Sequence, residues 1–133
     1  MMSSAAAALS PHHKSVMTPE RQATAKALFL ALEPIVSESP HMTGQNLLAF
    51  LRVGMDEGKG VTEYADAAGV YKTVMTRHLL DLGPRDRYGD EGLGLIVQAR
   101  DNKDLRINRA WVTQKGGALF DRAYHALTLL LRK

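Results

Sequence analysis

Residues 61–82 have the sequence VTEYADAAGVYKTVMTRHLLDL, which predicts two short helices joined by a sharp turn. Thr62 is a good N-cap residue for the first helix. One face of that helix would be buried, and it is formed by Tyr64, Ala65 and Ala68. Gly69 would end the helix, because glycine tolerates the left-handed backbone that lets a second helix start at a steep angle. We expect the second helix to cross close above Ala65, which requires a small side chain at that position.

The second helix is expected from about Tyr71 to Leu82. Its buried stripe, at i, i+4, i+7 spacing, is Met75, Leu79 and Leu82. The opposite face is polar near the helix N-terminus and carries Tyr71, Lys72, Thr73, Thr76 and Arg77. In a helix-turn-helix this end enters the major groove of DNA, and these side chains suit base edges and phosphates. Arg77 is the favoured contact to a base or its adjacent phosphate, whereas Tyr71 is equally well explained as a packing residue.

A β-hairpin is predicted after this reader helix. Residues 95–99 and 106–112 are two β-prone runs joined by a charged tip, and Thr113 would cap a final helix. A strand pair that follows a helix-turn-helix is a winged helix. The basic side chains of the wing are Arg100, Lys103, Arg106 and Arg109. They suit the minor groove, whose narrow stretches attract arginine, but Asp101 and Asp104 would pair with some of them and leave a solvated hairpin as the alternative.

Three segments resemble parts of the MarR-like (multiple antibiotic resistance type) regulators. Residues 101–106, DNKDLR, are similar to the Asp-x-Arg-Asp-x-Arg wing of that family, and residues 112–116, VTQKG, to its Leu-Thr-x-Lys-Gly. Residues 42–51, MTGQNLLAFL, look like the capped helix ahead of the reader. The resemblance covers roughly residues 40–120. It implies a mainly α winged helix-turn-helix with a small β-hairpin, dimerisation through the terminal helices, and a cleft in which relatives bind a small-molecule effector.

The chain departs from that pattern in two places. The linker from Gly83 to Gly94 is longer than the usual turn between reader helix and wing, and it is interpreted either as a mobile loop or as an added contact. His78 occupies a position where an apolar residue is more usual.

Length and composition predict one globular domain, since the chain has 133 residues, 45% of them hydrophobic and 23% charged. We expect a flexible arm at 1–17 and a winged-helix domain at 18–133, with a DNA-reading core at 43–112. Helices at 18–40 and 113–133 would carry apolar faces that include Ala25, Leu28, Phe29, Leu32, Leu127, Leu129, Leu130 and Leu131. A second subunit is the favoured partner for these faces, and the alternative is that they cover the protein's own core.

Several classes of function are disfavoured. The absence of cysteine excludes disulfides, thiolate zinc sites and cysteine nucleophiles. The five histidines lack the spacing of a metal site, and the glycines at 89, 92 and 94 lack a phosphate-binding pattern. We therefore expect no enzyme, no cofactor and no metal. The longest apolar runs are too short to span a membrane and the N-terminus lacks a signal-peptide pattern, so a cytoplasmic protein is expected. Trp111 is expected to anchor the wing to the final helix.

The sequence thus predicts a sequence-specific DNA-binding transcriptional regulator, a repressor that acts as a homodimer on an inverted repeat. The reader helix would contribute Tyr71, Lys72, Thr73, Thr76 and Arg77, and the wing Arg100, Lys103 and Arg106. The alternative is a winged-helix module for protein interaction, or an accessory to replication or partition, without base-specific reading.

Overall fold

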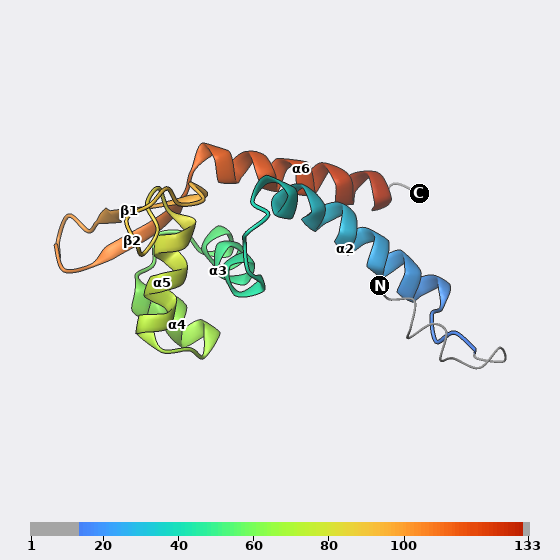
Figure 1. The fold of residues 1–133 in the computed structure, drawn as a ribbon, viewed down its shortest axis with the longest axis horizontal. Coiled ribbons are helices and arrows are strands. Elements are labelled where there is room, and N and C mark those ends of the chain that lie inside the picture. The colour runs from blue at the N-terminus through green and yellow to red at the C-terminus, as the bar shows by residue number, and fades with distance from the viewer. Residues whose placement is uncertain (1–13, 132–133) are drawn as a thin grey trace.

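The computed structural model describes residues 14–131 as five helices and one two-stranded antiparallel hairpin (Figure 1). The elements in chain order are α2 (Pro19–Glu38), α3 (Gly44–Met55), α4 (Val61–Ala68), α5 (Lys72–Leu82), β1 (Ile96–Arg100), β2 (Asn108–Val112) and α6 (Gln114–Leu131). This is the predicted winged helix-turn-helix with flanking terminal helices. The arm expected at 1–17 falls largely outside the described residues.

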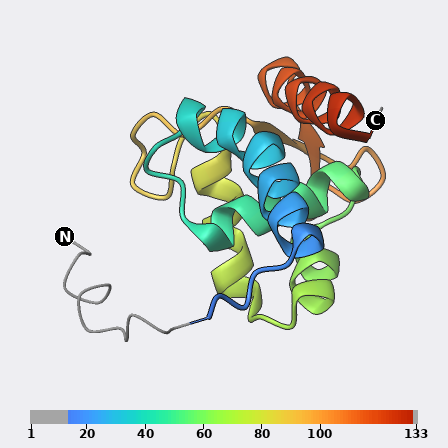
Figure 2. The same cartoon turned by 90° about the vertical axis from the view of Figure 1, so that its right-hand side faces the viewer.

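The molecule has two regions. Helices α3, α4 and α5 pack with the hairpin into a small globule, whereas α2 and α6 pack against each other and extend away from it (Figure 1). Figure 2 views the molecule from the end that these two helices form. Phe120 of α6 stacks on the fully buried Phe50 of α3, with ring centroids 4.6 Å apart. Gly54 of α3 permits this approach, because a Cβ there would lie 2.6 Å from the ring of Phe120.

Three helix starts have the predicted caps. The hydroxyl of Thr18 accepts the N–H of Arg21, and Pro19 occupies the first helical position of α2. At α3 the hydroxyl of Thr43 likewise accepts the N–H of Asn46, and at α6 the hydroxyl of Thr113 accepts the N–H of Gly116. These short polar caps satisfy N–H groups that lack partners within the helix, so the local sequence suffices to fix where the helices begin.

The helix-turn-helix consists of α4 and α5. Gly69 ends α4 in the left-handed conformation, with φ of 70°, and Ala65 is buried under α5, both as predicted. The predicted cap Thr62 is wrong, because Gly60 is the N-cap and Thr62 lies inside the first turn. The helix starts earlier because the carboxylate of Glu63 accepts the N–H of Gly60 at 2.8 Å, while Gly60 also pairs with the wing strand.

The hairpin pairs Ile96 with Val112 at its base, and β2 begins at Asn108 rather than at the expected Arg106. Residues 101–107 form the tip, where the N–H of Asp101 donates to the carbonyl of Ile107. The expectation for Trp111 is wrong. Side chains alternate along a strand, and since Ala110 takes the buried face, Trp111 lies on the outer face with 43% of its surface exposed. Its ring packs over Gly58 instead.

The long linker between α5 and β1 folds back on the end of α5. Its backbone is bonded at its base, where the N–H of Gly94 donates to Gly83 and that of Leu95 to Leu82. At its tip a carboxylate oxygen of Asp86 accepts two N–H groups, from Tyr88 and Asp90. These bonds favour an ordered loop over a mobile one. Its place, at the opposite end of α5 from the predicted reading residues, does not favour an added DNA contact.

No helix within residues 14–131 combines the length and the apolar character needed to cross a membrane.

Candidate nucleic-acid interface

The predicted reading residues all lie exposed on α5 or at its N-cap. Met75, Leu79 and Leu82 are buried, as expected, and they fix which side of the helix faces solvent. The solvent side carries Tyr71, Lys72, Thr73, Thr76 and Arg77. Tyr71 is the N-cap residue and is 82% exposed, so a packing role within this chain is not supported.

These residues form two stripes along the helix. Successive residues of an α-helix are rotated by about 100°, so residues four apart nearly align. Lys72 and Thr76 line a groove toward the hairpin. Thr73 and Arg77 are not part of that lining and form the neighbouring stripe.

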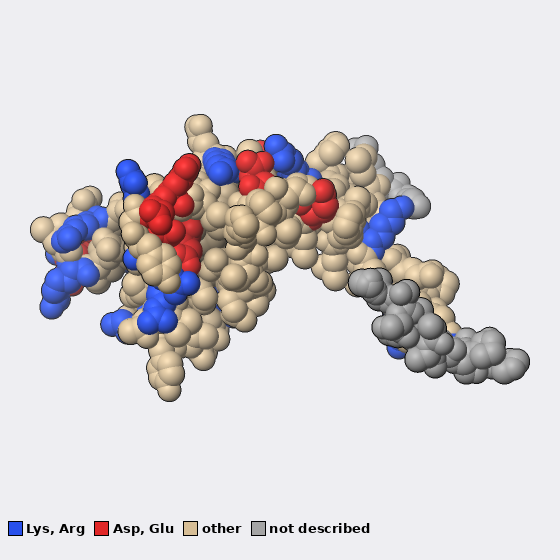
Figure 3. Space-filling model, in the orientation of Figure 1, with Lys and Arg blue, Asp and Glu red and all other residues tan. Residues whose placement is uncertain are grey.

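The wing carries basic side chains that differ in their partners. Figure 3 shows Lys and Arg side chains gathered over the hairpin end of the molecule. Arg106 pairs with Asp104 through two hydrogen bonds of 3.0 Å, which lower the pKa of Asp104 below its ordinary value. Arg100 donates to the carbonyl oxygen of Leu105 at 2.9 Å. Lys103, at the tip, makes no hydrogen bond or ion pair within the described part of the chain.

Arg109 occupies the base of the wing and is only partly exposed. Its guanidinium donates to the carbonyl oxygen of Gly58 at 2.8 Å and lies 3.4 Å from Asp101 and 3.9 Å from Glu63. These contacts join the hairpin to the turn before α4, so Arg109 is a structural residue of the wing. The expected pairing of Asp101 and Asp104 with wing bases is confirmed.

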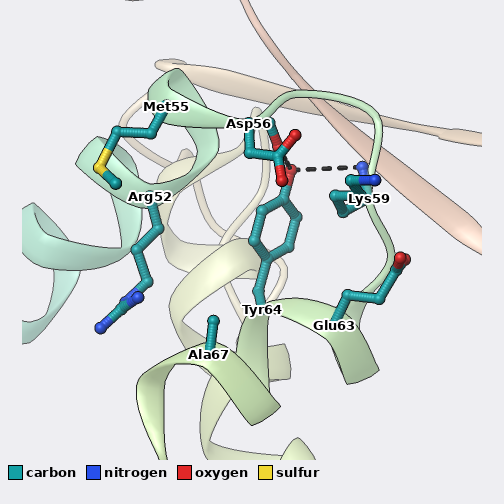
Figure 4. Close-up of a pocket in the computed structure, with 7 residues that line it drawn as sticks. All are labelled: Arg52, Met55, Asp56, Lys59, Glu63, Tyr64 and Ala67. Atoms are coloured by element: carbon teal, nitrogen blue, oxygen red, sulfur yellow. Dashed lines mark hydrogen bonds between the residues drawn. The ribbon is translucent and has the colours of Figure 1, made fainter.

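The turn that receives Arg109 also closes a cavity between α3 and α4 (Figure 4). The hydroxyl of Tyr64 donates to the carbonyl oxygen of Asp56 at 2.6 Å and accepts the N–H of Lys59 at 3.3 Å. Burial raises the pKa of this hydroxyl. The N–H of Ala110 in turn donates to the carbonyl oxygen of Lys59. Tyr64 thus supports the turn against which the wing is fixed.

A groove of about 340 Å³ separates α5 from the hairpin. Three elements line it, namely the first turn of α4, the exposed side of α5 and the strands of the wing. Its lining includes Thr62, Glu63, Lys72, Thr76, Gln98, Arg106 and Asn108. Thr62, Gln98 and Asn108 were not expected from the sequence. Only the fold brings them together, and the mistaken cap assignment placed Thr62 in another role.

His78 has a polar partner that accounts for its departure from the apolar pattern. Its Nδ1 lies 3.0 Å from Oδ1 of Asn46, a buried residue of α3. Desolvation lowers the pKa of His78, opposed by the nearby charge of Asp81 and assisted by that of Arg87. The pair links α3 to the reader helix.

Within residues 14–131, no cluster of three or more His, Asp or Glu side chains is arranged to hold a metal ion. No protein-family model matches the chain, and no curated protein matches it significantly in sequence.

Solved structures do match the fold. A MarR-like transcriptional regulator from Thermotoga maritima is 25% identical, with a TM-score of 0.57 over 90% of this chain and 80% of that one. Another transcriptional regulator from Thermotoga maritima is 14% identical, with a TM-score of 0.60 over 84% and 72%. A MarR transcriptional regulator from Methanosarcina mazei is 16% identical, with a TM-score of 0.57 over 82% and 71%. The chain therefore has the winged helix-turn-helix fold of the MarR-like transcriptional regulators.

Proposed function

We propose that this protein is a sequence-specific DNA-binding transcriptional regulator. The observation that carries the proposal is the polar, exposed N-terminal half of α5, set beside a basic wing on a MarR-like fold. Thr73 and Arg77 would read base edges in the major groove. The wing, through Arg100, Lys103 and Arg106, would contact the backbone or the minor groove.

The regulator would act as a homodimer. Helix α2 leaves Leu28 and Phe29 56% and 65% exposed, and both line an apolar hollow with Ala25, Leu32 and Val36. On α6, Tyr124, Leu127 and Leu129 are also exposed. The hollow on α2 is an apolar surface of the kind that usually meets a partner. A second copy would place two reader helices about one DNA turn apart on an inverted repeat, where occupancy blocks a promoter and represses transcription. A small-molecule effector stays a prediction.

Binding to DNA at several salt concentrations tests the proposal. A labelled genomic fragment from beside the protein's own gene would be compared with a scrambled duplex by fluorescence anisotropy. We expect selective binding whose logarithm falls with log salt at a slope of about −7, if roughly eight phosphates are neutralised per dimer. A slope near zero contradicts DNA binding.

Arg77→Ala separates the regulator from a winged-helix interaction module. The regulator should lose most of its preference for the genomic fragment, because a base contact supplies about 1–3 kcal/mol of discrimination. Arg85→Ala is the matched control, since Arg85 is exposed on the linker at the other end of α5. An interaction module should be indifferent to both changes.

A further inference from the structure

We propose that the groove between α5 and the hairpin holds one sugar-phosphate backbone of the DNA, and that Thr62 and Asn108 are positioning residues that bind it. In the same geometry, the negative charge of Glu63 lowers the affinity of the protein for DNA. This inference rests on the proposed function and adds two contact residues, Thr62 of α4 and Asn108 of β2, that lie on neither the reader helix nor the wing tip.

The course of the backbone follows from the arrangement of the elements. If α5 lies in a major groove and the wing reaches the adjacent minor groove, the strand that separates those two grooves must pass between α5 and the hairpin. The groove of about 340 Å³ is the space between them. Lys72 and Thr76 line it from one side and Asn108 from the other.

The chemistry of the lining suits a phosphate. Lys72 and Arg106 bring positive charge, although Arg106 is already paired with Asp104. The neutral donors Thr62 and Asn108 complete the lining, and such side chains supply many backbone contacts in protein–DNA interfaces. The N-cap of α4 is a glycine, so the first-turn N–H groups beside Thr62 have no N-cap side chain as acceptor, whereas the carboxylate of Glu63 accepts the N–H of Gly60 itself.

Glu63 is the exception in this lining. Its carboxylate accepts the N–H of Gly60 and is near Arg109, yet its side chain remains 53% exposed and lines both this groove and the cavity between α3 and α4. A carboxylate there repels a phosphate. Glu63→Gln keeps an oxygen that can accept the N–H of Gly60 and removes the charge, so it should tighten DNA binding.

Contacts to the backbone carry no base information, which makes the proposal testable without a known operator. The probes are a labelled mixed-sequence duplex and the genomic fragment described above. The variants are Thr62→Val, Asn108→Ala and Glu63→Gln in the full chain, each checked for an unchanged circular dichroism spectrum and melting temperature. Matched controls are Thr24→Val on α2 and Asp66→Asn on α4, because both residues are exposed and neither lines the groove.

We expect Thr62→Val and Asn108→Ala each to weaken binding about tenfold, equally on both duplexes, because each removes a hydrogen bond to a charged group. Glu63→Gln should bind roughly fivefold tighter on both. The two controls should change affinity less than about twofold.

The outcomes separate this inference from the function on which it rests. If the wild-type protein binds neither duplex at low salt, the proposed function fails. If it binds and Thr62→Val and Asn108→Ala match the wild type, only the groove proposal fails. Equal tightening by Glu63→Gln and Asp66→Asn would reflect net charge alone and would also overturn it, as would a loss confined to one duplex.

Discussion

The globule of α3, α4, α5 and the hairpin differs from the terminal helices in how its apolar residues are used. In the globule, Phe50, Met75 and Leu79 are almost completely buried. On α2, by contrast, Phe29 is largely exposed although it lies in the predicted apolar stripe. Hydrophobic periodicity is the same signal in both regions, but one face meets its partner within the chain and the other does not. The comparison indicates that the first region is packed within the chain, and the exposed apolar face of the second supports the proposed association with a second copy.

Phe50→Ala should have the largest effect on stability. Phe50 is fully buried and stacks on Phe120, so the substitution removes core packing and leaves a cavity. We expect the free energy of unfolding to fall by about 3–5 kcal/mol, measured by urea denaturation. Phe29→Ala on α2 provides the comparison. At protein concentrations low enough for the protein to be monomeric, its free energy of unfolding should fall far less. Similar losses in both variants would remove the distinction between the two regions.

Phe29→Asp should break association while leaving the globule folded. A charge in the apolar hollow of α2 would be costly to bury against a second copy. We expect sedimentation to show monomers and DNA affinity to fall about 100-fold, since the two reader helices are no longer linked. Met55→Asp is the control, because Met55 is an exposed apolar residue at the end of α3. A Phe29→Asp protein with unchanged mass in solution would contradict the dimer.

The wing offers a sharper version of the same comparison. Arg109 at its base has three acceptor groups around it, whereas Lys103 at its tip has none within the described residues. Arg109→Ala should lower the free energy of unfolding by about 1–2 kcal/mol. Lys103→Ala should leave stability unchanged and reduce the salt slope of DNA binding by about one for each phosphate that the lysine neutralises in the wild type. If Lys103→Ala lowered stability and Arg109→Ala reduced the salt slope, the structural role would belong to Lys103 and the DNA-binding role to Arg109.

Local signals predicted much of this fold. The caps at Thr18, Thr43 and Thr113 and the end of α4 at Gly69 depend on a few neighbouring residues, and the structure confirms them. Thr62 was misassigned because the start of α4 depends on a pairing of Gly60 with the distant Arg109.

The candidate site was only partly predictable for the same reason. Helical periodicity identified the exposed side of α5, two β-prone runs identified the wing, and charge identified its basic side chains. The role of Trp111 depends on which face of the hairpin meets the core, which the strand pattern alone did not decide. The groove that brings Asn108 near Thr62 exists only after folding, so no spacing in the sequence reveals it.

The smallest expected effect concerns pH and the pair that His78 forms with the buried Asn46. Desolvation holds the pKa of His78 below its ordinary 6.5 in the folded protein, while the unfolded chain keeps the ordinary value. Between these two pKa values the unfolded state binds more protons than the folded state. The contribution of His78 to the free energy of unfolding is therefore fully present above about pH 6.5 and is lost as pH falls toward the folded pKa. Urea denaturation between pH 5 and 8 would measure this decline in the wild type and in His78→Asn. The asparagine amide can occupy the place of Nδ1 but does not titrate. Asp81 and Arg87 act on the pKa of the ring in opposite directions, and desolvation is the largest of the three causes. If both proteins lose stability equally on acidification, the decline comes from other groups, and the polar link between α3 and the reader helix is insensitive to pH.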